Sequence, residues 1–207
     1  MFGRRRHPEP EVAPGSSPPP TAPLTMVRVA TATATTGRSI GRRDVDFSFD
    51  RVFVPSLMID HTELVLRQAG ACGEEGFVVW AGSLAGGDAY VSSVVVPKLS
   101  VGRIHGEVSA ETTARLLGAL DERDLVPIAQ LHTHPHEAFL SDTDAIRPIV
   151  AVHGFLSIVI PRFGFVDLAD PGRWSAHAFR GAGRWHELTA NERSGRFVID
   201  DSIIRVD

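Results

Sequence analysis

Short β-rich runs alternate with helical stretches from about residue 47 to the end of the chain. Chains of this kind bury one side of a β-sheet under helices, so the alternation predicts an α/β layered domain over residues 47–207, with a mixed β-sheet flanked by helices. Strands are expected at 77–81 and 89–96, joined as an antiparallel hairpin, and at 126–133, 155–160, 174–179, 185–188 and 197–206. Helices are expected at 56–69, with Ser56 as N-cap and Gly70 as the stop, at 109–123 behind Ser109, and in a short turn at 189–194.

The first 46 residues differ in composition from the rest of the chain. Residues 1–25 hold seven of the 14 prolines, three consecutive arginines and almost no apolar side chains. Such a segment cannot bury enough apolar surface to offset the entropy of ordering it, so it is predicted to be a disordered tail. Residues 26–46, rich in Thr, Ala and Arg, are predicted to be a weakly structured lead-in.

Charge and cysteine content exclude several classes of protein. With 25 acidic and 21 basic residues, the formal charge of −4 provides no positive field to attract nucleic acid or an anionic membrane. The one cysteine, Cys72, cannot form an internal disulfide, which favours a reducing compartment. No apolar run approaches the roughly 20 residues of a membrane-spanning helix. We therefore expect a cytoplasmic protein that binds neither nucleic acid nor membrane.

The segment 130–148 contains residues suited to bind a metal. His132 and His134 stand two residues apart at the end of a predicted strand, where alternation places both imidazoles on one face, with Cα atoms roughly 6 to 7 Å apart. Ser141 then begins a helix as its N-cap, which brings Asp144 back toward the strand end. Two histidines and one carboxylate leave the fourth position of a tetrahedral zinc free for water, as in catalytic zinc sites. One zinc ion per chain is predicted.

Other interpretations of these residue types are weaker. His136 follows the proline that ends the strand and is expected in an exposed loop. A cysteine hydrolase needs a histidine positioned beside Cys72, which the sequence does not supply, so Cys72 is expected to be a loop residue. A zinc deaminase needs a Pro-Cys-x-x-Cys pair of ligands, which a single cysteine excludes. An amidohydrolase barrel needs about 250 residues, more than this chain has.

The pattern His132-x-His134-Pro135, followed by Ser141-x-x-Asp144, resembles the JAMM motif of the MPN+ domain metalloproteases. These zinc enzymes include deubiquitinases and compact bacterial relatives. The resemblance implies a JAB/MPN-like layered domain, with an architecture similar to that of the cytidine deaminases.

The same motif includes a glutamate upstream of the histidines, on a hydrophobic segment that ends in glycine. The run from Glu75 to Gly82 matches that segment. Glu74 is the alternative glutamate.

The resemblance implies a zinc-dependent peptidase or isopeptidase. Zinc held by His132, His134 and Asp144 activates a water molecule at neutral pH. Glu75 accepts the proton and passes it to the leaving amine, and Ser141 donates a hydrogen bond to the oxyanion.

The substrate implied by the resemblance is a ubiquitin-like protein, cleaved after its C-terminal tail during deconjugation or precursor processing. Such enzymes hold the tail as an added β-strand. Activating and conjugating enzymes of a bacterial ubiquitin-like or defence system are the implied partners. Two alternatives stay open: processing of a ubiquitin-like sulfur carrier or its amino-acid adduct, and a non-catalytic MPN-type interaction module.

Overall fold

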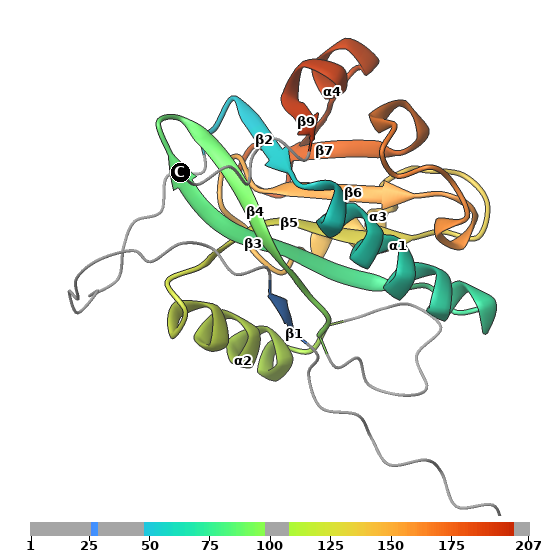
Figure 1. Ribbon diagram of the computed structural model, residues 1–207, viewed down its shortest axis with the longest axis horizontal. Helices are drawn as coiled ribbons and strands as arrows, with labels where there is room; N and C mark the ends of the chain where they lie inside the picture. Colours follow the sequence, from blue (N-terminus) through green and yellow to red (C-terminus); the bar gives the residue numbers. More distant parts are fainter. Residues whose placement is uncertain (1–25, 29–47, 98–107, 201–207) are drawn as a thin grey trace, which may run out of the picture.

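The computed structural model describes residues 26–28, 48–97 and 108–200 of the chain (Figure 1). Within these ranges one nine-stranded sheet has the order β8-β7-β6-β5-β3-β4-β2-β9, and β1 pairs with β4. The strands are β1 Met26–Arg28, β2 Arg51–Val54, β3 Phe77–Ala85, β4 Asp88–Val95, β5 Val126–Thr133, β6 Leu156–Ile160, β7 Ser175–Phe179, β8 Trp185–Glu187 and β9 Phe197–Ile199. The helices are α1 Ser56–Ala71, α2 Ala110–Asp121, α3 Asp142–Ile146 and α4 Ala190–Arg196, with 3-10 turns η1 Arg162–Gly164 and η2 Pro171–Arg173. The predicted mixed α/β fold is confirmed.

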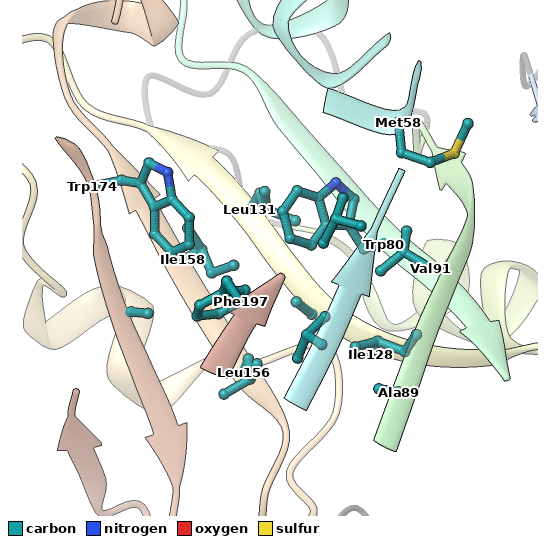
Figure 2. Close-up of a cluster of buried hydrophobic side chains, with 14 of the residues drawn as sticks. Met58, Trp80, Ala89, Val91, Ile128, Leu131, Leu156, Ile158, Trp174 and Phe197 are labelled. Atoms are coloured by element: carbon teal, nitrogen blue, oxygen red, sulfur yellow. The ribbon is translucent and has the colours of Figure 1, made fainter. Parts of the chain in front are cut away.

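Two hydrophobic clusters lie against this sheet, each under its own helix. In the larger one, Met58 of α1 packs with Trp80 of β3 and Leu131 of β5 (Figure 2). In the smaller one, Leu116 of α2 packs with Phe77 of β3. Because neighbouring side chains of a strand point to opposite faces, α1 and α2 cover opposite faces of the sheet. Figure 1 shows the two helices on either side of the long strands β3 and β4.

The register between β3 and β5 assigns each residue at the end of β5 to a face. These strands are antiparallel, with Phe77 opposite His132 and Val78 opposite Leu131. Cross-strand partners share a face, so His132 points to the side covered by α2. Thr133 points to the side covered by α1.

The hairpin of β3 and β4 is confirmed, with a β3 that continues to Ala85 instead of ending at Ala81 and a β4 that begins one residue earlier than predicted. The two strands are antiparallel up to the pair Ala85 and Asp88. Gly86 and Gly87 alone connect them, with φ of 60° and 82°. A two-residue turn with both φ values positive matches the twist of the strands, which therefore continue up to the glycines.

The predicted helix α1 is confirmed, but the roles assigned to Ser56 and Gly70 at its two ends were wrong. Pro55, not Ser56, is the N-cap, because the carbonyl of Pro55 accepts the first backbone hydrogen bond, from Met58. Gly70 lies inside the helix, which continues to Ala71. This glycine allows the turn η1 to approach, since an added Cβ would lie 2.5 Å from Cβ of Phe163.

The remaining expected elements are present near their predicted bounds. Strand β5 has the predicted bounds, Ser109 caps α2 by accepting from the amide of Thr112, and α4 occupies the expected helical turn. Strand β2 was not predicted, and β1 lies inside the lead-in that the sequence marks as weakly structured. Residues 1–25, 29–46 and the end of the predicted last strand, 201–206, lie outside the described residues. No helix in the described ranges has the length and apolar character needed to cross a bilayer.

Candidate metal centre

Strand β5 and the residue that follows it supply two histidines in the middle of the sheet. It lies between β3 and β6, and the side chains of both His132 and His134 are buried. His134 follows the last residue of β5, and its amide donates to the carbonyl of Ile160 at the end of β6. The two imidazole rings lie on the same side, with centroids 5.0 Å apart. The predicted placement of both imidazoles on one face is confirmed.

Helix α3 supplies a carboxylate through its N-terminal cap. Ser141 is the N-cap, and its Oγ accepts from the amide of Asp144 at 3.2 Å. In return, Asp144 Oδ2 accepts from the Ser141 amide at 3.0 Å and from the Ser141 hydroxyl at 2.6 Å. This reciprocal capping box is what turns the carboxylate back toward the strand end, as predicted.

The three side chains meet at distances that suit a metal ion. Nε2 of His132 and Nε2 of His134 lie 3.3 and 3.4 Å from Asp144 Oδ2. Two ligands about 2.0 to 2.1 Å from a tetrahedral zinc are separated by about 3.3 Å. One ligand atom from each of the three residues lies within 4.8 Å of the others.

The chemistry of the donor set agrees with a bound cation. Nε2 of His132 is buried and has no hydrogen-bond partner among the described residues. A buried nitrogen without a partner carries a desolvation cost, and a metal ion bound at its lone pair removes that cost. The three residues therefore fit a zinc ion.

Electrostatics keep the carboxylate in its ligand form. Burial by itself raises the pKa of Asp144, but contacts with His132, His134 and Ser141 outweigh burial and hold the pKa well below its ordinary value. Asp144 is therefore ionised at neutral pH, as a metal ligand must be.

The structure distinguishes between the two candidate glutamates. Extending the register of Phe77 with His132 by two residues places Glu75 opposite His134, on the face that holds the imidazoles. Glu75 is partly buried, and its carboxylate makes no hydrogen bond or ion pair with any described residue. Glu74 is exposed. As the neighbour of Glu75 in the chain, it is expected to point to the opposite face of the sheet. Glu75 is therefore the glutamate on the face of the metal centre.

Two other residues with possible metal-binding or nucleophilic side chains, His136 and Cys72, are not part of this cluster. His136 is exposed in the loop after β5, and Cys72 is an exposed free cysteine in the turn after α1. Both outcomes agree with the sequence predictions.

Two aromatic residues at this site were missed in the sequence. The ring of Phe139 stands edge-on to that of His134, at 4.9 Å, while half of its side chain is exposed. The indole Nε1 of Trp185 in β8 donates to the carbonyl of Ala145 at 2.9 Å and so ties α3 to the sheet. Phe139 stands between the two halves of the motif in the sequence, so its place near the site could have been predicted. The contact of Trp185 spans 40 residues and has no local signal.

Comparisons with known proteins extend these observations. No family model matches the sequence. The chain is 29% identical over 142 residues to a protein of Sinorhizobium fredii named "Probable metalloprotease y4jG", and the alignment covers 66% of this chain and 86% of that protein.

Two solved structures are similar to this chain. Protein DSY2949 from Desulfitobacterium hafniense has a TM-score of 0.53 at 14% identity, covering 73% of this chain and 94% of its own, which shows a shared fold. A JAB1/MPN domain protein from Archaeoglobus fulgidus has a TM-score of 0.39 at 12% identity, covering 73% of this chain and 98% of its own.

The name of this relative agrees with the cluster of His132, His134 and Asp144, which could hold a metal ion and whose order along the chain resembles that of the JAMM motif. The sequence similarity to a protein named as a metalloprotease supports the resemblance of this chain to the JAMM/MPN metalloprotease-like family.

Proposed function

We propose that this metallo-hydrolase is a zinc-dependent peptidase or isopeptidase that cleaves after the C-terminal tail of a ubiquitin-like protein. The observation that carries the proposal is the convergence of ligand atoms from His132, His134 and Asp144, among them the buried Nε2 of His132, which has no hydrogen-bond partner among the described residues. A site with two histidines and one carboxylate has the ligand number of a catalytic zinc rather than a structural one.

Each residue of the site has a role in amide hydrolysis. Zinc, when bound by the three ligands, lowers the pKa of water toward neutrality and polarises a carbonyl. Glu75, whose carboxylate is free of described partners, accepts a proton from the attacking water and delivers it to the leaving amine.

Ser141 combines a structural and a chemical role. Its hydroxyl donates to Asp144 Oδ2, which places the Ser141 Oγ beside the ligand atoms. Rotation about the Cβ–Oγ bond turns the same hydrogen toward the oxyanion that forms as the amide is attacked. Removal of one such donor reduces rates by about 10²- to 10³-fold.

The substrate assignment is supported by the position of the histidines at a strand end and by the resemblance to deubiquitinases. The histidines lie at the end of a strand, where an extended chain approaches more readily than a folded domain. Half-exposed Phe139 beside His134 offers an apolar contact to such a chain. We propose a tail that ends in a small residue, glycine above all, and a cytoplasmic setting with activating and conjugating enzymes as partners.

The test uses a ubiquitin-like protein from the same genome, fused at its C-terminus to a reporter through a peptide bond or a lysine isopeptide bond. We expect metal-dependent cleavage of both fusions, abolished by a chelator and restored by zinc. Cleavage of the peptide fusion alone would favour the sulfur-carrier alternative. Cleavage of neither fusion would contradict the proposed substrate.

A pair of neighbouring variants tests the proposed base in the same assay. Glu75→Gln is expected to retain zinc and to reduce kcat by about 10²-fold or more, because it removes a proton acceptor and no ligand. Glu74→Gln, an exposed neighbour with the same chemistry, is the matched control and is expected to remain active. The reverse result would assign the base to Glu74.

A further inference from the structure

Thr133 lies between the two histidines in the sequence, at the end of β5. Its side chain is fully buried and points to the face opposite the imidazoles. The Thr133 Oγ1 accepts from the amide of Gly76 at 2.7 Å, and the Thr133 amide donates to the carbonyl of Gly76 at 3.0 Å. Thr133 therefore binds both backbone polar groups of the residue that follows Glu75.

These two hydrogen bonds hold the segment that leads into β3 beside the end of β5. Strand β3 begins at Phe77, so Glu75 and Gly76 precede its regular ladder. Gly76 is buried, and without the Thr133 hydroxyl its amide would have no partner among the described residues. The position of Glu75 thus depends on a hydroxyl on the far side of the sheet.

The segment is also confined from the side of α1. An added Cβ at Gly76 would lie 2.8 Å from Cδ2 and 3.0 Å from Cα of Leu66. The Gly76 backbone therefore rests directly on the helix and cannot move toward it. Between Leu66 and Thr133, one position is available to the residue after Glu75.

The methyl group of Thr133 faces the turn that holds His134. The carbonyl of His134 accepts from the amide of Phe163 in η1 at 2.9 Å. A Cβ added to Gly164 of the same turn would lie 3.6 Å from Cγ2 of Thr133. Arg67 of α1 fixes the turn by donating to the carbonyl of Gly164 at 3.0 Å. One side chain therefore hydrogen-bonds the segment of Glu75 and lies beside the turn behind His134.

We propose that Thr133 is a positioning residue that sets the place of the Glu75 carboxylate relative to the two imidazoles. The inference rests on the proposed function, because it acts through Glu75 as the base. A displacement of about 1 Å at a reacting group is enough to reduce a rate by about 10²-fold. The hydroxyl of Thr133 therefore affects the chemical step without touching substrate or metal.

The test compares Thr133→Val, which keeps the shape and removes the acceptor, with Thr133→Ser, which keeps the hydroxyl. In the full chain we expect Thr133→Val to lower kcat about 10-fold or more, with KM and zinc affinity unchanged within about twofold. Thr133→Ser should recover most of kcat. Zinc affinity is measured by competition with a chromophoric chelator, and melting temperatures confirm that each variant is folded.

A double-mutant cycle with Glu75→Gln separates positioning from general damage. If Thr133 acts through Glu75, then Thr133→Val has little further effect on kcat in the Glu75→Gln background. An equal loss in both backgrounds, or a loss of zinc affinity that parallels kcat, would overturn the inference. If Thr133→Val does not fold, Thr133→Cys replaces it, with the same expected loss because a thiol is a weak acceptor.

Failure of this inference differs from failure of the proposed function. An active wild type with a fully active Thr133→Val variant would overturn the positioning role alone. A wild type that cleaves neither fusion would overturn the proposed function and, with it, the role of Thr133 in catalysis.

Discussion

At the scale of single residues, Asp144 Oδ2 is the atom of the proposed metal centre that lies near both histidines and Ser141. It lies 3.3 Å from Nε2 of His132 and 3.4 Å from Nε2 of His134, and it accepts the hydroxyl of Ser141 at 2.6 Å. The ligand, the helix cap and the proposed oxyanion donor therefore share one oxygen. Replacing Ser141 affects both the stability of α3 and the chemistry of the site.

Two substitutions of Ser141 separate these effects. Ser141→Ala should lower kcat by about 10²- to 10³-fold because it removes the oxyanion donor, and it should cost about 1 kcal/mol in unfolding free energy because it removes a cap. Ser141→Thr keeps a hydroxyl and should retain most of both. Kinetics on the fusion substrate and urea unfolding measure the two quantities. A fully active Ser141→Ala variant would remove Ser141 from the mechanism.

At the scale of elements, the contact of α1 with η1 supports the backbone of His134. Three successive residues of η1, Arg162, Phe163 and Gly164, have φ values of 55°, 54° and 83°. Non-glycine residues rarely adopt such values, so surrounding contacts must hold the turn in place. One of these contacts is the close approach of Phe163 to Gly70.

Two helical glycines should respond oppositely to the same substitution. Gly70→Ala forces a Cβ to within 2.5 Å of Phe163 and should destabilise the fold by about 1 to 3 kcal/mol. Gly118→Ala in α2 meets nothing within 4 Å and should stabilise it by about 0.5 to 1 kcal/mol, as a glycine in a helix interior costs about that much relative to alanine. Urea unfolding of both variants measures the signs. Stabilisation by Gly70→Ala would contradict the packing described here.

The N-terminal cap of α4 contributes to the stability of the fold in a pH-dependent way. The backbone of Thr189 and then the side chain of His186 bind the carboxylate of Glu192 and lower its pKa to about 2. A folded-state pKa below the unfolded value gives stability that is present above about pH 4.5 and is lost as pH falls through about 2. The melting temperature of Glu192→Gln should therefore fall further below wild type at about pH 7 than at about pH 3. A difference that does not change with pH would contradict this.

At the scale of the whole molecule, the sequence predicts those features that depend on short spacings. Strand alternation and a helix cap both act within a few residues, so the placement of His132, His134 and Asp144 could be inferred from one short segment. The face occupied by Glu75 depends on the register of β3 with β5, across more than 50 residues, and has no local signature. Gly70 was misread as a helix stop because its role lies in packing against η1 rather than in local conformation.

The order of strands was also beyond local inference. Strand β5 lies between β3 and β6, and this order buries both histidines in the centre of the sheet. Strand β2 has four residues, too few to show the alternation that identifies a strand. The burial of the site and the strands beside it therefore depend on long-range strand pairing, which the local sequence pattern does not show.

Elemental analysis of the purified protein tests the central claim most directly. The wild type should contain about one zinc per chain, and His132→Ala, His134→Ala and Asp144→Ala should each lose most of it, because three ligands are the minimum for such a site. Asp142→Asn, an exposed carboxylate in the same helix, is the matched control and should keep its zinc. A full zinc content in all three ligand variants, or none in the wild type purified with added zinc, would contradict the account.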